Sequence, residues 1–284
     1  MSLMGRNIFR WMRLAGIAML MGLAVGLTGP AAAGAISETF AKHIQSSSTV
    51  VDHSAWDRLL KAYLISGPDG LNQVDYKLFK NKGHAALKTY LTALQAIDVT
   101  QLSRPEQFAF WANLYNAKTI DIVLTHYPVK SIRDIDISGL FADGPWGKKV
   151  VVVNGVELSL DDIEHKIMRP LFRDPRVHYA VNCASVGCPN LPRDAFTGRM
   201  LEDQLTKGAE AYINSRRGVS IMGREATVSK IYRWYGEDFG GDKAGILQHL
   251  RKYAQGPLAA KLEAIEDIGD YAYDWSLNDG LIGH

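Results

Sequence analysis

The densest group of reactive residue types lies between residues 178 and 188. His178 is followed by Cys183 and Cys188, with Ser185 between the two cysteines. Three interpretations stay open. The first is a Cys183–Cys188 disulfide, which is natural in an exported protein. The second is a nucleophilic Cys183 thiolate, activated by a histidine and nearby backbone amides, and the third is a metal held by the cysteines and a histidine. Two cysteines without a second close pair are a weak zinc signal. We therefore expect no metal and no cofactor.

The histidine that could serve Cys183 depends on the element around it. Residues 177–182 are short and mostly apolar, which predicts a central strand. Side chains alternate between the two faces of a strand, so His178 would meet Cys183 only if the strand bends. His165 belongs to a separate predicted helix and is free of this constraint. We therefore favour His165 as the partner of Cys183, and keep His178 as a second candidate.

A second cluster is the segment 159–165, which reads Ser-Leu-Asp-Asp-Ile-Glu-His. Ser159 is predicted to cap a helix that ends near Pro170. Glu164 projects into the apolar face of this helix, and His165 lies at its margin. A carboxylate that points toward a core must be neutralised, paired or functional. Pairing with a nearby arginine and a role in a site both remain possible for Glu164.

A polar stripe runs along the most apolar predicted helix, residues 103–126. Ser103 and Glu106 have the spacing of a capping box. Glu106, Asn113 and Asn116 lie within about 80° of one another around the helix axis. Either Glu106 closes the capping box while the asparagines brace a neighbouring loop, or the stripe lines a polar cavity. In the second case Glu106 or Asn113, or Glu164 from the second cluster, would orient a catalytic histidine or polarise a carbonyl.

The remaining pattern defines the fold class. Asn154-Gly155 joins two β-branched runs and predicts a hairpin over residues 149–158. Residues 219–228 predict a second hairpin around Gly223. Most other periodic segments are helical, without regular β-α-β alternation. This indicates an α+β fold, a predominantly helical single domain around a small mixed or antiparallel sheet with hairpins.

The amino terminus has the three zones of a secretory signal peptide, predicted to span residues 1–33. Three arginines precede an uncharged, mostly apolar run over residues 14–27, and Ala31-Ala32-Ala33 follows. The run is shorter than the roughly 20 residues of a membrane span. We expect cleavage, a short polar lead-in over residues 34–50, one globular domain over residues 51–284, and a periplasmic or secreted protein.

Loss of this leader removes the apparent basic character of the chain. The whole sequence has 32 basic and 30 acidic residues, a formal charge of +2. Without three leader arginines, 29 basic residues face the same 30 acidic ones. No basic cluster remains to bind phosphates, so we expect no nucleic-acid partner. No second long apolar run follows, so we expect no membrane span after cleavage.

Several of these segments together resemble the family called domain of unknown function 547. The resemblance is carried by residues 106–117, 127–132, 159–165, 177–189, 228–235 and 273–278. It implies that the stretches around Asn113, His165, His178 and Cys183 are family signatures. The family also includes plant proteins that look intracellular, which favours a site role for Cys183 over an obligatory disulfide.

Two functions follow as hypotheses. The first is a thiol-dependent hydrolase or acyl transferase, in which Cys183 attacks an amide or ester of a small-molecule or peptide substrate and a histidine takes its proton. The second is a non-catalytic envelope domain that binds a ligand or partner and has a Cys183–Cys188 disulfide. Thiol titration distinguishes them.

Overall fold

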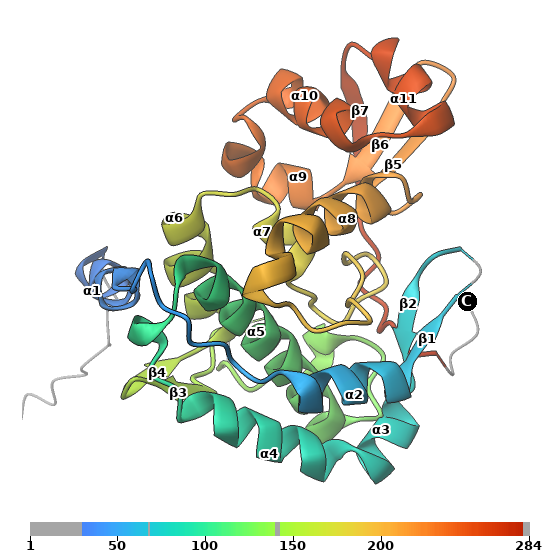
Figure 1. Ribbon diagram of the computed structural model, residues 1–284. Coiled ribbons are helices and arrows are strands. Elements are labelled where there is room, and N and C mark those ends of the chain that lie inside the picture. The colour runs from blue at the N-terminus through green and yellow to red at the C-terminus, as the bar shows by residue number, and fades with distance from the viewer. Residues whose placement is uncertain (1–29, 68, 140–142, 281–284) are drawn as a thin grey trace, which may run out of the picture.

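The computed structural model describes residues 30–67, 69–139 and 143–280 (Figure 1). The α-helices in this part of the chain are α1 (Pro30–Ala41), α2 (Ser54–Tyr63), α3 (Tyr76–Lys82), α4 (His84–Gln95), α5 (Arg104–His126), α6 (Arg169–Phe172), α7 (Val177–Ala180), α8 (Leu201–Ile213), α9 (Ile231–Trp234), α10 (Lys243–Tyr253) and α11 (Gly256–Glu263). The predicted signal peptide lies outside the described residues up to residue 29. Its last residues begin α1.

The strands are short and form three small sheets. They are β1 (Leu64–Ser66), β2 (Asn72–Val74), β3 (Val151–Val153), β4 (Val156–Leu158), β5 (Val219–Met222), β6 (Glu225–Ser229) and β7 (Ile268–Ala272). β1 pairs with β2 and β3 with β4, both antiparallel, while the third sheet has the order β5-β6-β7. In that sheet β6 pairs antiparallel with β5 and parallel with β7. The fold is the expected mostly helical α+β class, with a mixed sheet.

Both predicted hairpins are present. Asn154 and Gly155 connect β3 to β4 with φ values of 47° and 75°, the left-handed backbone that a type I′ turn requires. Gly223, with φ 62°, occupies the equivalent turn between β5 and β6. Local turn chemistry therefore selects these two hairpins.

Two hydrophobic cores lie one above the other in Figure 1. The first surrounds α5, which is apolar on nearly every side and buried along most of its 23 residues. The helices α2, α3 and α4 pack around it in the lower part of the picture. The second core lies among α8, α10 and the sheet β5-β6-β7 in the upper part. The segment between β4 and α8 connects them.

The start of α5 differs from the prediction. Ser103 is the N-cap residue, but its side chain makes no capping hydrogen bond. Glu106 does not close a capping box, because its carboxylate accepts the backbone N–H groups of Gly198 at 3.1 Å and Val51 at 3.5 Å. The Glu106 carboxylate, which the sequence pattern predicts to bond the start of α5, therefore bonds two other segments of the chain.

The helix after β4 also differs in part. Ser159 caps it as predicted, since its Oγ accepts the Asp162 N–H at 3.1 Å. Residues Asp162–Met168 form a π-helix (η3), and the chain continues through Pro170 to the end of α6 at Phe172. Pro170 lies in the first turn of α6, where its missing N–H is tolerated. The predicted end near Pro170 is therefore wrong by about half a turn.

The predicted strand over residues 177–182 is wrong. Val177–Ala180 form the short helix α7, and the chain becomes extended only at Val181. Short apolar runs suit a strand and a buried helical turn equally well. Here Asn116 favours the helical turn, because its side chain binds the Ala180 carbonyl and the Asn182 N–H, each at 2.8 Å. A side chain of α5 thus takes the place of a neighbouring strand.

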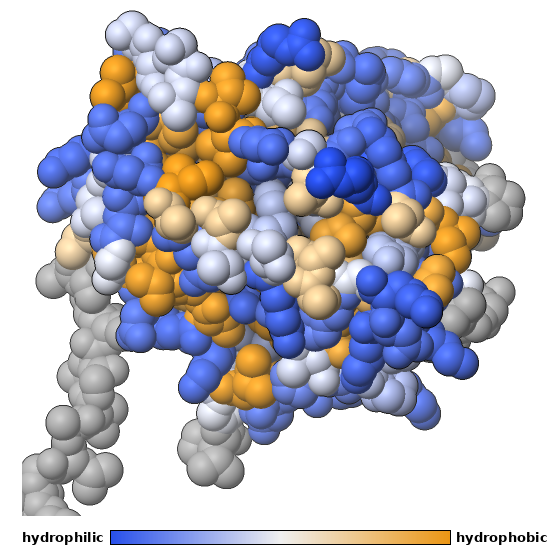
Figure 2. All heavy atoms as spheres, turned by 60° about the horizontal axis from the view of Figure 1, so that its bottom comes forward, coloured by the Kyte–Doolittle hydropathy of each residue, from blue (hydrophilic) through white to orange (hydrophobic). Residues whose placement is uncertain are grey.

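The surface is of mixed character. Figure 2 shows hydrophilic residues over much of one face, with hydrophobic residues interspersed among them. Among the described residues, no helix is long and apolar enough to cross a membrane.

Candidate functional site

A cavity of about 390 Å³ opens between the two cores and brings together most of the predicted site residues. Cys183, Cys188, Glu164, His165 and His178 all line it. The other lining residues are Tyr115, Ser138, Asp143, Gly144, Trp146, Gly147, Asp161, Val181, Pro189, Ile231, Trp234, Tyr235, Tyr273 and Trp275. Residues up to 160 positions apart, from Tyr115 to Trp275, therefore meet in one pocket, as is common where two packed units adjoin.

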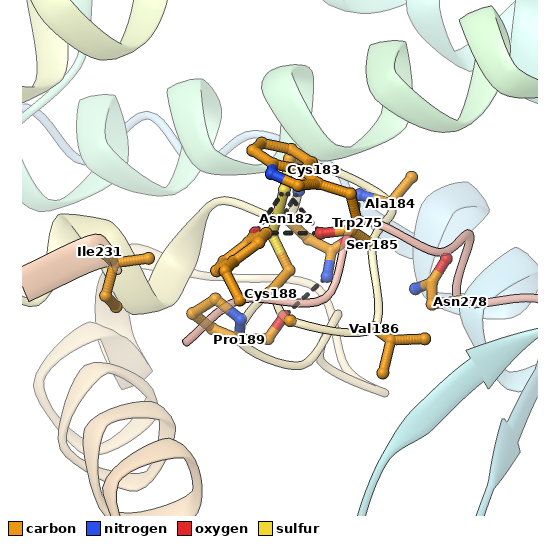
Figure 3. Close-up of a disulfide and its surroundings, with 12 residues drawn as sticks. Asn182, Cys183, Ala184, Ser185, Val186, Cys188, Pro189, Ile231, Trp275 and Asn278 are labelled. Carbon is orange, nitrogen blue, oxygen red and sulfur yellow. Dashed lines mark hydrogen bonds between the residues drawn. A yellow bond between two sulfur atoms is a disulfide. The ribbon is translucent and has the colours of Figure 1, made fainter. Parts of the chain in front are cut away.

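The two cysteines form a disulfide on the wall of this pocket (Figure 3). Their Cα atoms are 6.2 Å apart, within the usual range. Of the three interpretations left open by the sequence, the structure has the disulfide, so neither sulfur is a free thiolate or a metal ligand in this state. Among the residues described, no group of three or more His, Cys, Asp or Glu side chains is arranged to hold a metal ion.

The disulfide sulfurs contact hydroxyl and amide groups. Cys183 Sγ lies 3.0 Å from the Tyr273 hydroxyl and 3.2 Å from Ser185 Oγ, and these two hydroxyls are 2.9 Å apart. The Cys183 N–H donates to Cys188 Sγ at 2.9 Å. Ser185 therefore acts on the site through Cys183 and Tyr273.

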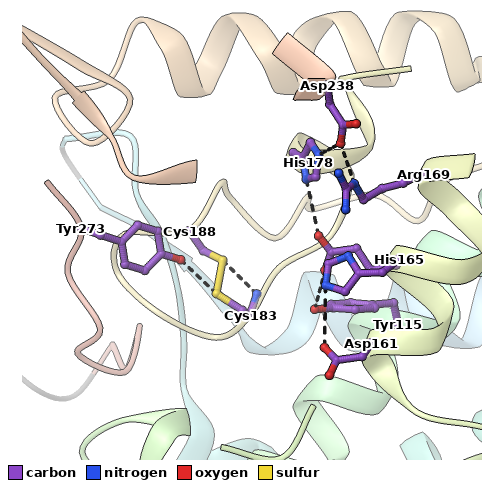
Figure 4. A network of polar contacts seen from close by, with 10 residues as sticks. Tyr115, Asp161, His165, Arg169, His178, Cys183, Cys188, Asp238 and Tyr273 are labelled. Carbon is purple, nitrogen blue, oxygen red and sulfur yellow. Dashed lines mark hydrogen bonds and ion pairs between the residues drawn. A yellow bond between two sulfur atoms is a disulfide. The ribbon is translucent and has the colours of Figure 1, made fainter. Parts of the chain in front are cut away.

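His178 lies between two carboxylates (Figure 4). Its Nε2 is 2.7 Å from Asp238 Oδ2, and its Nδ1 is 3.4 Å from Glu164 Oε1. The Asp238 carboxylate also accepts from Arg169 Nε at 2.6 Å. Tyr115 donates to Glu164 at 3.2 Å. A buried network of alternating charge thus forms one side of the pocket.

The titration of this network follows from its contacts. Burial lowers the pKa of His178, but the contacts with Asp238 and Glu164 outweigh burial and raise it overall. Burial raises the pKa of Glu164, but His178, His165 and Tyr115 lower it overall. For Asp238, burial is likewise outweighed by His178 and Arg169, so its pKa is lowered. The geometry therefore favours a protonated His178 between two ionised carboxylates.

His165 lies at the pocket margin. Its side chain is one-third exposed, its Nε2 is 3.8 Å from Asp161 Oδ1, and its ring is tilted against that of Tyr235. Its Nδ1 is buried and has no hydrogen-bond partner among the described residues. His165 and Glu164 both come from the π-helix η3, a type of irregularity frequent at functional sites.

The stripe on α5 braces the site from behind and does not line the pocket. Asn113 binds both backbone groups of Phe196, at 2.8 and 3.0 Å. Asn116 holds the segment that leads into Cys183, as described above. Glu106 holds Gly198 and Val51. All three predicted residues are buried, and the interpretation of the asparagines as braces of neighbouring loops is confirmed.

Sequence reasoning missed several residues of the pocket and of the charged network beside it. Asp238 and Tyr273 lie 60 and 90 residues from the side chains they contact. Asp161 lies within the segment 159–165. The aromatic wall comes from residues 231–235 and 273–275, which are rich in Trp and Tyr. That aromatic clustering was the only signal available.

The fold and the pocket together define a helix-rich α+β protein with an aromatic-walled site that carries a disulfide. Residues 99–213, from the turn η1 (Val99–Gln101) to the end of α8, match the family described as Protein of unknown function, DUF547. This match supports the family resemblance that the sequence carries. The matched segment contains α5, the π-helix and both cysteines. No curated protein and no solved structure matches the chain.

Proposed function

We propose that this is an exported protein of the cell envelope that binds an amine-bearing small molecule or peptide in the pocket between its two cores. The observation that carries this proposal is Asp161. Its carboxylate lines the pocket, is 49% exposed, and forms no salt bridge with a lysine or arginine among the described residues. A cationic ligand group would supply the missing partner.

The electrostatics of Asp161 support this choice of ligand. Burial raises the pKa of Asp161, and the neighbouring charges of Glu164 and Asp162 add to the increase, while His165 and Lys166 oppose it. A carboxylate in such surroundings gains from a nearby cation, because the ionised form is insufficiently compensated. The described lining residues include no lysine or arginine, and the charge of the protonated His178 is balanced by Glu164 and Asp238.

The aromatic wall supports the same ligand class. Trp275 contacts Tyr273, Trp234 and Trp146, with ring centroids 4.7, 5.6 and 5.8 Å apart. The faces of Trp and Tyr rings attract organic cations, most strongly where water is excluded. These rings would also bury the carbon skeleton that carries the amine. An aromatic wall next to a carboxylate without a lysine or arginine partner is therefore suited to an organic cation.

Ligand titration tests the proposal. Hexylamine, hexanol and hexanoate share one carbon chain and differ in head group, and binding is followed by the fluorescence of the pocket tryptophans. Hexylamine should bind at least about tenfold more tightly than hexanol, with hexanoate weakest, a preference of about 1.4 kcal/mol. Asp161→Asn should remove this preference. Glu157→Gln, an exposed carboxylate on β4, serves as the control. Equal binding of the three probes, or no binding, rejects the proposal.

The thiol-dependent hydrolase or acyl transferase is a second candidate, favoured by the shared pocket of Cys183, His165 and His178. Its thiolate would become available only after reduction of the disulfide. A protonated His178 is a poor base, so His165 would take the proton of Cys183. The test uses p-nitrophenyl acetate. Cys188→Ser should release a burst of p-nitrophenol and gain one acetyl group by mass, while Cys183→Ser should do neither. Equal behaviour of the two variants rejects this candidate.

A further inference from the structure

The two cysteine residues of the disulfide differ in their exposure to solvent. Cys183 is partly exposed at the pocket wall, whereas Cys188 is 4% exposed. A thiol that enters the pocket can therefore approach Cys183 Sγ more readily than Cys188 Sγ. The sequence has two cysteines, so no further thiol of this chain can take part.

Each sulfur also has its own hydrogen-bond donors. Cys188 Sγ accepts the Cys183 N–H at 2.9 Å. Cys183 Sγ lies within hydrogen-bond distance of the Tyr273 and Ser185 hydroxyls, at 3.0 and 3.2 Å. Such donors stabilise a thiolate and lower its pKa, so they help each sulfur to leave during exchange. A disulfide with a purely structural role needs no donors on both sulfurs.

The loop around the disulfide is held independently of the bond. Asn182 donates to the Pro189 carbonyl at 2.6 Å and accepts the Ala184 N–H at 2.8 Å (Figure 3). Arg217 binds the Cys188 carbonyl from outside the loop. A five-residue separation also restricts little chain entropy in the unfolded state. The loop should therefore keep its shape when the disulfide opens.

We propose that Cys183–Cys188 is a redox-active disulfide that oxidises a dithiol substrate bound in the pocket. A substrate thiolate attacks Cys183 Sγ and forms a mixed disulfide. The Cys183–Cys188 bond breaks, and its electron pair stays on Cys188 Sγ, next to the Cys183 N–H. The second substrate thiolate then attacks the substrate sulfur of the mixed disulfide. This step releases the Cys183 thiolate beside Tyr273 and Ser185. The substrate becomes a disulfide, and the two cysteines end as thiols after taking up protons.

The first test compares the two sulfurs in single-cysteine variants. Each full-length variant is incubated with glutathione disulfide, and the mixed disulfide is followed by mass spectrometry. Cys188→Ser, which keeps Cys183, should form the adduct at least tenfold faster than Cys183→Ser. Circular dichroism establishes that both variants are folded. Equal rates overturn the proposal.

The second test examines the donors and the native disulfide. In the Cys188→Ser background, Tyr273→Phe should shift the pH profile of Cys183 alkylation by iodoacetamide to higher pH. Tyr271→Phe, on the neighbouring strand β7, should leave the profile in place. In the otherwise unchanged chain, dithiothreitol should open the disulfide without denaturant. An unshifted profile, or reduction only in urea, overturns the proposal.

This inference does not depend on amine binding. Hexylamine titration uses the oxidised protein, whereas glutathione exchange uses the single-cysteine variants, so either proposal can fail while the other stands.

Discussion

At the scale of single residues, His178 has the most constrained surroundings in the pocket. It is buried between Glu164 and Asp238, and the latter is also paired with Arg169. Charges removed from water are stable only when they are paired and hydrogen-bonded. Because the pKa of His178 is raised above its unfolded value, its contribution to stability is fully present below pH 6.5. That contribution is lost as the pH rises through the folded pKa.

Asp238→Asn tests this network. The substitution keeps the shape of the side chain but removes its charge, so the pKa of His178 should fall. We expect the free energy of unfolding at pH 6 to decrease by about 2 kcal/mol, less than for a fully buried pair. NMR titration of the His178 ring and urea unfolding measure the two effects. Asp270→Asn, an exposed carboxylate on β7, is the control. An unchanged pKa of His178 would show that Asp238 does not govern its titration.

At the scale of elements, α5 organises the chain around the pocket through side-chain bonds to backbone groups. Asn116 fixes the end of α7, Asn113 fixes Phe196, and Glu106 fixes Gly198. These buried backbone groups have no strand or helix partner, and an unpaired buried group costs about 1–3 kcal/mol. Three polar side chains on one apolar helix therefore hold the backbone between α7 and α8, a role that a neighbouring strand would have in a sheet.

Gly198→Ala tests the contact at the start of α5. A Cβ atom at this position would lie 2.6 Å from Glu106 Oε1 and 2.9 Å from the Glu106 backbone N. The backbone cannot easily move, so we expect a loss of about 1–3 kcal/mol in unfolding free energy. Gly236→Ala, where a Cβ would meet nothing within 4 Å, is the matched control. Denaturant unfolding measures both variants, and equal stabilities would contradict the tight contact.

At the scale of the whole molecule, each core contacts a histidine whose pKa is lowered by burial. His53 accepts or donates a 2.7 Å hydrogen bond with Tyr90 in the first core, and burial lowers its pKa from 6.5 to about 4. His249 contacts Tyr179 in the second core, and burial together with Lys252 lowers its pKa to about 4. Between pH 6.5 and 4 the unfolded chain binds more protons, so both cores lose stability as the pH falls.

The pH dependence of unfolding checks this coupling. At pH 5, protonation of His53 in the unfolded chain should lower stability by about 2 kcal/mol relative to pH 7. His53→Gln cannot titrate, so its unfolding free energy should change less between these two pH values, even if it is lower at pH 7. Urea unfolding at both pH values gives the comparison. An identical change in the unaltered chain and in His53→Gln would contradict the assignment.

The proposed export is also tested on the whole molecule. If residues 1–33 are a cleaved leader, intact mass measurement of the protein from a periplasmic fraction should give a chain that begins at Gly34. Substitution of Ala31 and Ala33 by bulky residues should leave the leader attached, since the peptidase requires small side chains there. A mature protein that begins at Met1 would contradict the proposal.

Much of the local structure could be predicted from periodicity and turn chemistry. Helix α5 and the hairpins at Asn154-Gly155 and Gly223 depend on residues close together in the chain, so local sequence patterns predict them. The close spacing of the cysteines allowed a disulfide but did not distinguish it from a free thiolate or a metal site. The capping box at Ser103 failed because Glu106 has distant partners that no local pattern reveals.

By itself, the sequence determined the mostly helical α+β class, the family resemblance, and the segments from which the site is built. Only the tertiary structure decided that residues 177–180 form a helix, that the cysteines are bonded, and that His178 pairs with Asp238. The reason is the range of the interactions. Periodicity reports which face of an element is buried, whereas the partners of a buried charge or backbone group are chosen by packing between residues 60 or more positions apart.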